Sequence, residues 1–167
     1  MRAHLPAAFR AVLDFAYYSG WRRNEILYLT FSEVDLAAGV VRLSAGRSKT
    51  EAPRLRPLSE PLRQVLARRR KRRQAGDGRV FERDGVPVRA WRYALRDGCA
   101  RAGVPHRLLH DCRRTAARNL VRARVPERVA MVLTGYKTRS LFDRYNIVNE
   151  RELFKAGDQL VAYLKRR

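Results

Sequence analysis

Side chains that could act together on a phosphodiester stand in four separate short segments of this chain. Arginine offers a permanent positive charge, lysine and histidine can give up a proton, and tyrosine can act as a nucleophile. The candidates, in chain order, are Arg22, Lys49, His110, Arg113, Tyr136 and Tyr145. Their chemistry depends on a fold that brings these distant segments to one place.

These residue types match the needs of phosphodiester cleavage without a metal ion. The charge on the non-bridging oxygens must be offset, which two guanidiniums such as Arg22 and Arg113 do best. A tyrosine can bond covalently to the phosphorus, and Lys49 or His110 could protonate the leaving oxygen. The sequence shows no evident Asp/Glu cluster for two Mg²⁺ ions, so we expect no metal and no cofactor.

Each segment taken alone has a simpler interpretation. Arg22 and Glu25 are three residues apart and could form a surface ion pair on a helix. Lys49 could be a solvated lysine at a hairpin tip. His110 shares a helix face with Arg113, which suits phosphate recognition at a helix start, but a lone histidine is more often structural. Only the combination of segments favours catalysis.

The charge of the chain points to a nucleic-acid partner. Its 167 residues carry 37 Lys and Arg against 16 Asp and Glu, a formal net charge of +21. Such a surplus repels itself in a compact state and is offset best by a polyanion. Only five of the 37 are lysine, which leaves 32 arginines, so GC-rich codons could contribute part of the excess. Charge alone predicts nucleic-acid binding and says nothing about chemistry.

Other features of the composition narrow the class. The apolar fraction of 46% is too high for a disordered basic tail. No apolar run approaches the roughly 20 residues of a membrane span, and no signal peptide is evident. The two cysteines, Cys99 and Cys112, lack a metal-binding spacing. We expect a cytoplasmic protein with no membrane partner.

Apolar spacing predicts a mostly α-helical (α+β) domain with a small antiparallel sheet. Two β runs at 39–43 and 54–58 flank a polar loop that contains Lys49, which suits a hairpin with an exposed tip. Residues 30–35 look like a turn, and an Asp-Gly pair predicts another within 81–86. Helical spacing predicts helices over 5–18, 22–29, 58–74, 88–102, 110–123, 126–134 and 150–164, with a short helix or turn over 139–146.

A run of six basic residues, 68–73, closes the predicted helix 58–74. Cations are favoured at the C-terminal end of a helix, where they are usually solvated. The same side chains could contact DNA phosphates. The sequence leaves both interpretations open.

Four segments follow one another in this chain: GWRRNEILYLTFSEVDL, SKT, HDCRRTAARNLV and LTGYKTRSLFDRY. Together they resemble the catalytic domain of the tyrosine recombinases, the phage-integrase family, from about Leu5 to beyond Tyr145. Because the motifs are discontinuous and correctly ordered, the match is more specific than any one short pattern. The resemblance implies a single catalytic domain over residues 1–167, without the family's N-terminal core-binding domain. DNA affinity would then be weaker and more dependent on salt.

The resemblance also implies roles for individual residues. Tyr145 matches the nucleophile that the family joins to the DNA 3′-phosphate. Lys49 matches the hairpin lysine that acts as general acid on the leaving 5′-oxygen. Arg22 matches the first catalytic arginine, and His110 and Arg113 match a His-x-x-Arg pair.

The match continues at two supporting residues and departs from the family pattern near the nucleophile. Glu25 and Asp35 match the acidic residues that support the first arginine segment. Gly135-Tyr136 stands where the family has Gly-His or sometimes Gly-Trp. A phenol donates one hydrogen bond but cannot carry the charge of a protonated histidine, so we expect activity that is retained or weakened. Cys112 replaces a usual leucine, a small apolar change.

The function that the resemblance implies is a site-specific DNA recombinase or integrase. It would cut and rejoin double-stranded DNA through a 3′-phosphotyrosyl intermediate, without metal or ATP, as a tetramer on DNA at the nucleoid. Residues 149–167 would dock on a neighbouring subunit or pack on their own core. Two alternatives stay open: a type IB topoisomerase-like strand transferase, and a truncated, catalytically impaired DNA-binding remnant.

Overall fold

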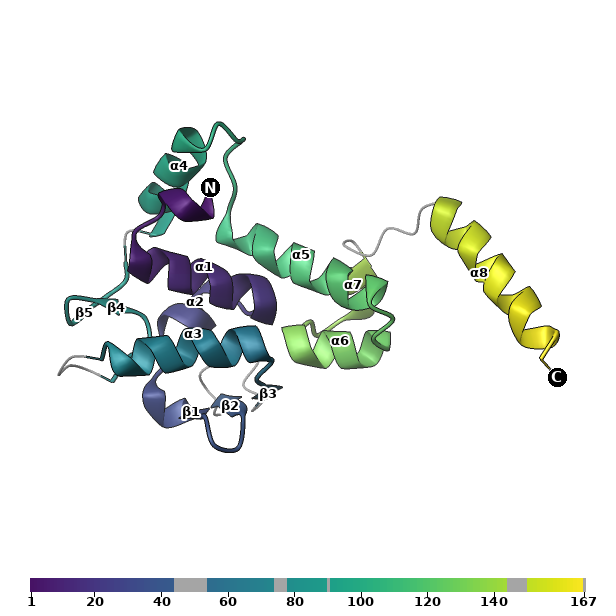
Figure 1. The fold of residues 1–167 in the computed structure, drawn as a ribbon, viewed down its shortest axis with the longest axis horizontal. Coiled ribbons are helices and arrows are strands. Elements are labelled where there is room, and N and C mark those ends of the chain that lie inside the picture. The colour runs from purple at the N-terminus through teal and green to yellow at the C-terminus, as the bar shows by residue number, and fades with distance from the viewer. Residues whose placement is uncertain (44–53, 74–77, 90, 144–149, 167) are drawn as a thin grey trace.

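Three helices form the centre of the molecule (Figure 1). In this computed structural model α1 (Ala7–Ser19) packs against both α5 (Leu109–Arg122) and α3 (Glu60–Lys71). The structure describes residues 1–43, 54–73, 78–89, 91–143 and 150–166. The largest side chains with almost no exposure are Trp21, Phe15, Phe81, Phe142, Ile26, Leu29, Leu43, Leu62, Leu66 and Leu95. Burial of these apolar groups is the main contribution that stabilises the packed centre of the molecule.

The predicted helices all have counterparts, and the mostly α-helical class is confirmed. The other helices that correspond to predicted segments, and the N-terminal 3-10 turn, are η1 (Arg2–His4), α2 (Arg23–Leu27), α4 (Trp91–Arg101), α6 (Glu127–Thr134), α7 (Arg139–Asp143) and α8 (Glu150–Leu164). Some helix ends differ from the prediction. α4 begins three residues late because the Val88 N–H donates to the Phe81 carbonyl at 3.2 Å, which keeps Val88 in a hairpin.

A three-stranded antiparallel sheet has the order β1–β2–β3. β2 (Val40–Leu43) pairs with β3 (Arg54–Pro57), which confirms the two predicted β runs, and the loop with Lys49 lies outside the described residues. Residues 30–35, predicted as a turn, instead contain a 3-10 turn, η2 (Phe31–Glu33), and the short strand β1 (Val34–Asp35). Two paired residues are too few for the alternation that marks a strand in sequence.

The predicted Asp-Gly turn joins a second small sheet. β4 (Glu82–Arg83) pairs with β5 (Val86–Pro87), and both turn residues have positive φ, 54° at Asp84 and 77° at Gly85. These are the dihedrals of the tight hairpin turns that Asp-Gly favours. Arg69 of α3 donates to the carbonyls of Val80 at 2.9 Å and Glu82 at 2.6 Å, so this member of the basic run 68–73 holds the hairpin against α3.

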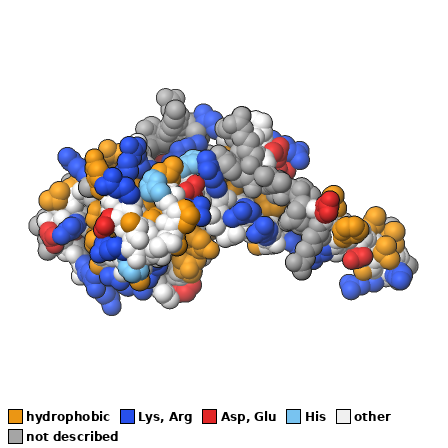
Figure 2. Space-filling model, turned by 90° about the horizontal axis from the view of Figure 1, so that it is seen from above, with side chains coloured by type: hydrophobic (Ala, Val, Ile, Leu, Met, Phe, Trp, Pro, Cys, Tyr) orange, Lys and Arg blue, Asp and Glu red, His pale blue; other side chains and the backbone are white. Residues whose placement is uncertain are grey.

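A smaller apolar cluster lies beside the main core. It joins α5, α6 and α7 through Ala117, Ala130 and Phe142, with Tyr136 packed against it. α8 extends to one side of the molecule, and its apolar side chains are exposed; Phe154 is 75% exposed (Figures 1 and 2). Among the described helices none has the length and apolar character needed to cross a membrane.

Arg56 is a charged residue on the inner face of β3. It is buried opposite Val41, and its only hydrogen bond within the described structure runs from Nη2 to the Tyr18 carbonyl at 2.8 Å. Burial lowers the pKa of Arg56 to about 10, followed in size by the effect of Arg54. A buried cation with unsatisfied donors costs stability that an apolar side chain of similar length would not.

We therefore predict that Arg56→Met stabilises the fold. The free energy of unfolding should rise by about 1 kcal/mol, because the desolvation cost exceeds the one lost hydrogen bond. Urea denaturation followed by circular dichroism measures this difference. A drop in stability would show that the bond to Tyr18 outweighs the buried charge.

Candidate active site

Two glycines that end helices supply backbone carbonyls to the candidate site. Gly20 ends α1 with φ 66°, and Gly135 ends α6 with φ 74°. A Cβ on Gly20 would lie 2.8 Å from the Ala116 Cβ, and one on Gly135 would overlap the Arg54 guanidinium. Only glycine combines this backbone conformation with such close neighbours. The carbonyls at these helix ends, which carry partial negative charge, are free to accept from arginine.

Arg22 reaches one of these caps from the start of α2. Its Nη2 donates to the Gly135 carbonyl at 2.9 Å, and its Nη1 donates to Glu25 Oε1 at 3.0 Å. The Arg22 backbone N–H also donates to Glu25 Oε2 at 2.9 Å. The side chain remains 30% exposed, so its guanidinium is fixed in place and still open to a ligand.

Arg113 approaches the same place from the first turns of α5 and is only 2% exposed. Its Nη1 donates to the Gly20 carbonyl at 2.8 Å and to the Thr134 carbonyl. Burial lowers the pKa of Arg113 to about 10, so it stays charged at neutral pH. The structure thus brings Arg22 and Arg113, 91 positions apart in the sequence, onto neighbouring carbonyls of the segment 134–135.

Glu25 is the buried carboxylate that holds these cations together. It pairs with Arg22 and, through Oε2, with Nη2 of Arg54 at 2.6 Å. Arg54 also donates to the Thr134 carbonyl at 3.2 Å and lies over the Trp21 ring. Sequence reasoning missed Arg54. The available signal was two arginines, Arg54 and Arg56, at alternate positions of a β run, which places them on one face.

His110 lies one turn before Arg113 on α5 and is exposed. Neighbouring atoms nevertheless remove part of the water around its imidazole, and this desolvation is the main cause that lowers its pKa. The positive charges of Arg113 and Arg114 lower the pKa further. The imidazole is therefore mainly neutral at pH 7 and can either donate or accept a hydrogen bond. A bound anion would reverse this shift.

Tyr136 packs its ring against the Arg113 guanidinium. Its ring centroid is 4.1 Å from the Arg113 guanidinium carbon, and its edge packs against Phe142 at 5.7 Å between centroids. Its hydroxyl oxygen is buried. In this arrangement the ring face supports Arg113 by a cation–π contact.

Three sequence candidates remain, namely Lys49, Tyr145 and Asp35. Lys49 and Tyr145 fall outside the described residues. Asp35 accepts from the Ala38 N–H at 2.8 Å and pairs with Arg42, so it supports the turn into β2 and contacts none of the arginines above. The Ala38 bond is the main cause of a lowered pKa at Asp35. Within the described residues no group of three His, Cys, Asp or Glu could hold a metal ion.

Comparison with solved structures identifies the class of fold. The XerA recombinase matches with a TM-score of 0.75 and 21% identity over 90% of this chain and 57% of its own. A Tn1549 transposon integrase in complex with circular intermediate DNA matches with a TM-score of 0.75 and 17% identity, over 90% and 59%. A lambda integrase dimer bound to a COC′ core site gives 0.66 and 20%, over 85% and 43%. The fold is that of a tyrosine recombinase catalytic domain, and the chain spans about half the length of these proteins.

The family is identified by a match between the sequence and a protein-family model. The model of the phage integrase family matches residues 2–152. This chain therefore belongs to the phage integrase family of tyrosine recombinases, which confirms the resemblance seen in its motifs. No curated protein sequence matches the chain.

The Gly135 cap gives a direct prediction. Gly135→Ala should lower the free energy of unfolding by about 2–3 kcal/mol. The left-handed backbone conformation is unfavourable for alanine, and the added Cβ would displace the Arg54 guanidinium. Gly103→Ala is the matched control, because Gly103 has φ 62° with nothing within 4 Å of the added Cβ. Chemical denaturation of both variants compares them, and equal losses would contradict the close packing of Arg54 on Gly135.

The environment of His110 gives a second prediction. Its titration midpoint, followed by NMR without DNA, should lie below the ordinary value of 6.5. Arg114→Gln should move it upward by removing one positive neighbour. Because the unfolded chain binds this proton more tightly, stability should fall as the pH drops through 6.5 and below. A midpoint at or above 6.5 would contradict the account.

Proposed function

We propose that this protein is a site-specific DNA recombinase or integrase that cuts and rejoins DNA through a 3′-phosphotyrosyl intermediate. The observation that carries the proposal is the pairing of Arg22 and Arg113 on the adjoining carbonyls of Gly135 and Thr134. Two guanidiniums fixed this closely repel each other unless an anion joins them. A phosphodiester, with one negative charge shared by two oxygens, is the ligand that suits the pair.

The chemical step needs a nucleophile and an acid besides the arginines. The Tyr145 hydroxyl loses its proton to the neutral His110 or to water while its oxygen attacks the phosphorus. The phosphorus–O5′ bond breaks, and a proton from Lys49 or His110 goes to the leaving 5′-oxygen. A 5′-hydroxyl then attacks the phosphotyrosine, giving its proton back to the group that acted as general acid. The phosphorus–tyrosine bond breaks, the diester re-forms, and the tyrosine oxygen takes up a proton. One phosphate ester replaces another at each step, so neither ATP nor a metal ion is required.

The arginines stabilise the charge that builds on the phosphate in this step. Arg22 is open to the ligand, whereas Arg113 is buried and fixed by two carbonyls, so little reorganisation is needed when the charge develops. His110 stands on the same helix face as Arg113 and adds a third donor. Tyr136 contributes first by holding Arg113, and its buried hydroxyl would have to move to reach a phosphate.

A basic cleft beside α2 supports DNA as the partner. It has a volume of about 590 Å³ and is lined by Arg23, which follows Arg22 in the chain, and none of the described residues that line it is acidic. Its basic members are Arg23, Arg79, Arg89 and Arg92, and its aromatic members are Tyr28, Trp91 and Tyr93. Guanidiniums of this kind bind backbone phosphates and position a duplex without reading its sequence. Such an enzyme works in the cytoplasm, at the nucleoid.

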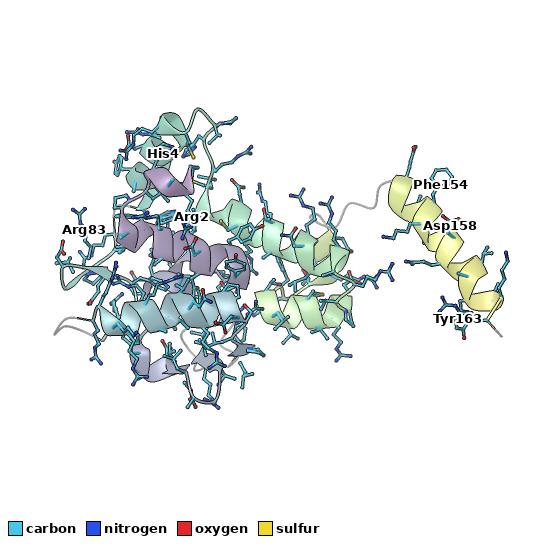
Figure 3. The ribbon with its side chains drawn as sticks, in the orientation of Figure 1. Arg2, His4, Arg83, Phe154, Asp158 and Tyr163 are labelled. Atoms are coloured by element: carbon cyan, nitrogen blue, oxygen red, sulfur yellow. The ribbon has the colours of Figure 1, made fainter. Side chains whose placement is uncertain are left out.

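Assembly on DNA is the second part of the proposal. α8 exposes apolar side chains on a helix that extends away from the core, including Phe154 and Tyr163 (Figure 3). An amphipathic helix needs a partner surface for such a face. Its extended position favours docking on a neighbouring subunit in a tetramer over packing on its own core.

Covalent capture tests the proposed chemistry. The protein is incubated with a pool of nicked duplexes of random sequence, the mixture is denatured, and protein-linked DNA is separated on a gel. We expect an adduct from the wild type and from Tyr136→Phe, and none from Tyr145→Phe, because only Tyr145 supplies the nucleophile.

Circular dichroism of each variant confirms that it is folded. Absence of an adduct from the wild type on any duplex would leave only DNA binding, and an adduct from Tyr145→Phe would assign the nucleophile elsewhere. Relaxation of supercoiled DNA by the monomer would favour a topoisomerase.

A further inference from the structure

Arg54 touches both halves of the arginine site. From β3 its Nη2 lies 2.6 Å from Glu25 Oε2, and Glu25 in turn holds Arg22. Its Nη1 donates at 3.2 Å to the Thr134 carbonyl, which also accepts from Arg113. Among the described residues, no other side chain contacts both Glu25, which holds Arg22, and the Thr134 carbonyl, which accepts from Arg113.

The surroundings of Arg54 hold its guanidinium in one orientation. One face lies over the Trp21 ring, with 5.2 Å from the guanidinium carbon to the ring centroid, and Gly135 approaches so closely that no Cβ would fit between them. The side chain is only 9% exposed. The Arg54 guanidinium is thus engaged with Glu25, the Thr134 carbonyl and the Trp21 ring, and Arg54 acts through these neighbours.

We propose that Arg54 is a positioning residue for strand cleavage. It sets the distance between Glu25 and the 134–135 carbonyls, and through them the separation of the Arg22 and Arg113 guanidiniums. This inference rests on the proposed function. A fork of two nitrogens is needed to span both partners, which arginine has and lysine lacks.

Arg56 offers a matched control. It lies two residues further along the same inner face of β3 and is also a buried arginine, but among the described residues it donates only to the Tyr18 carbonyl. Arg56→Met removes a buried guanidinium from this strand without touching Glu25 or Thr134. A general effect of losing a buried charge from β3 would appear in both variants.

The first measurement is the rate of covalent adduct formation under single-turnover conditions, with the DNA dissociation constant measured in parallel. Arg54→Met should slow cleavage by about 100-fold with unchanged DNA binding, since misplaced catalytic groups cost rates of this order. Arg54→Lys should give an intermediate rate, and Arg56→Met should match the wild type. Equal rates for Arg54→Met and the wild type would overturn the proposal.

A substrate with sulfur in place of the bridging 5′-oxygen separates two modes of action. A thiolate leaves without protonation, so this substrate removes the need for the general acid. If Arg54 positions the arginines, the defect of Arg54→Met persists on the sulfur substrate. Restoration of the wild-type rate would instead connect Arg54 to proton transfer and overturn the proposal.

Hydrogen exchange gives a readout that does not depend on activity. In Arg54→Lys the amides of residues 20–25 and 131–136 should exchange faster, while those of α3 and α4 keep the wild-type rates. Unchanged exchange in both segments would overturn the positioning role even if the wild type formed no adduct. Failure of the adduct alone would count against the proposed function and not against this role.

Discussion

Three buried or half-buried guanidiniums around a single carboxylate are the constraint on which this fold depends. Arg22, Arg54 and Arg113 would repel one another strongly in a medium of low polarity. Glu25 offsets part of that charge by pairing with two of them. The rest is offset by carbonyls, since each arginine donates to at least one carbonyl at the C-terminal end of α1 or α6. The lowered pKa of Arg113 reflects the cost of burial that remains.

The architecture follows from the need to bring these groups together. The arginines come from α2, β3 and α5, and the accepting carbonyls come from the glycine caps of α1 and α6. Two segments more than a hundred positions apart, around Arg22 and Gly135, are joined by a direct hydrogen bond. The main core fixes α1, α3 and α5, and the smaller cluster around Phe142 fixes α6 against α5. Three of the chain's arginines thus meet at a place where an anion could offset part of their charge.

The sequence was sufficient to predict the helices and to point to some of the residues of the candidate site. Regular apolar spacing marks long amphipathic helices, and the order of the motifs pointed to Arg22, His110 and Arg113, which the structure places on converging elements. Arg54 was missed because an arginine in a short β run is usually solvated, and only tertiary contacts show that it faces inward. The role of Asp35 in a turn could not be separated from support of Arg22 by sequence position alone. Lys49 and Tyr145 remain predictions from the family motifs.

In the proposed function, the arginine site offsets the charge of one phosphate. The most direct measurement replaces a non-bridging oxygen of the scissile phosphate by methyl, which removes its negative charge, and compares adduct formation by the wild type and Arg22→Ala. On ordinary DNA the variant should be slower by at least about 100-fold, the usual loss for one charge-stabilising donor. On the neutral methylphosphonate, we predict that Arg22→Ala forms the adduct at a rate close to that of the wild type. An equal deficit on both substrates would contradict this prediction.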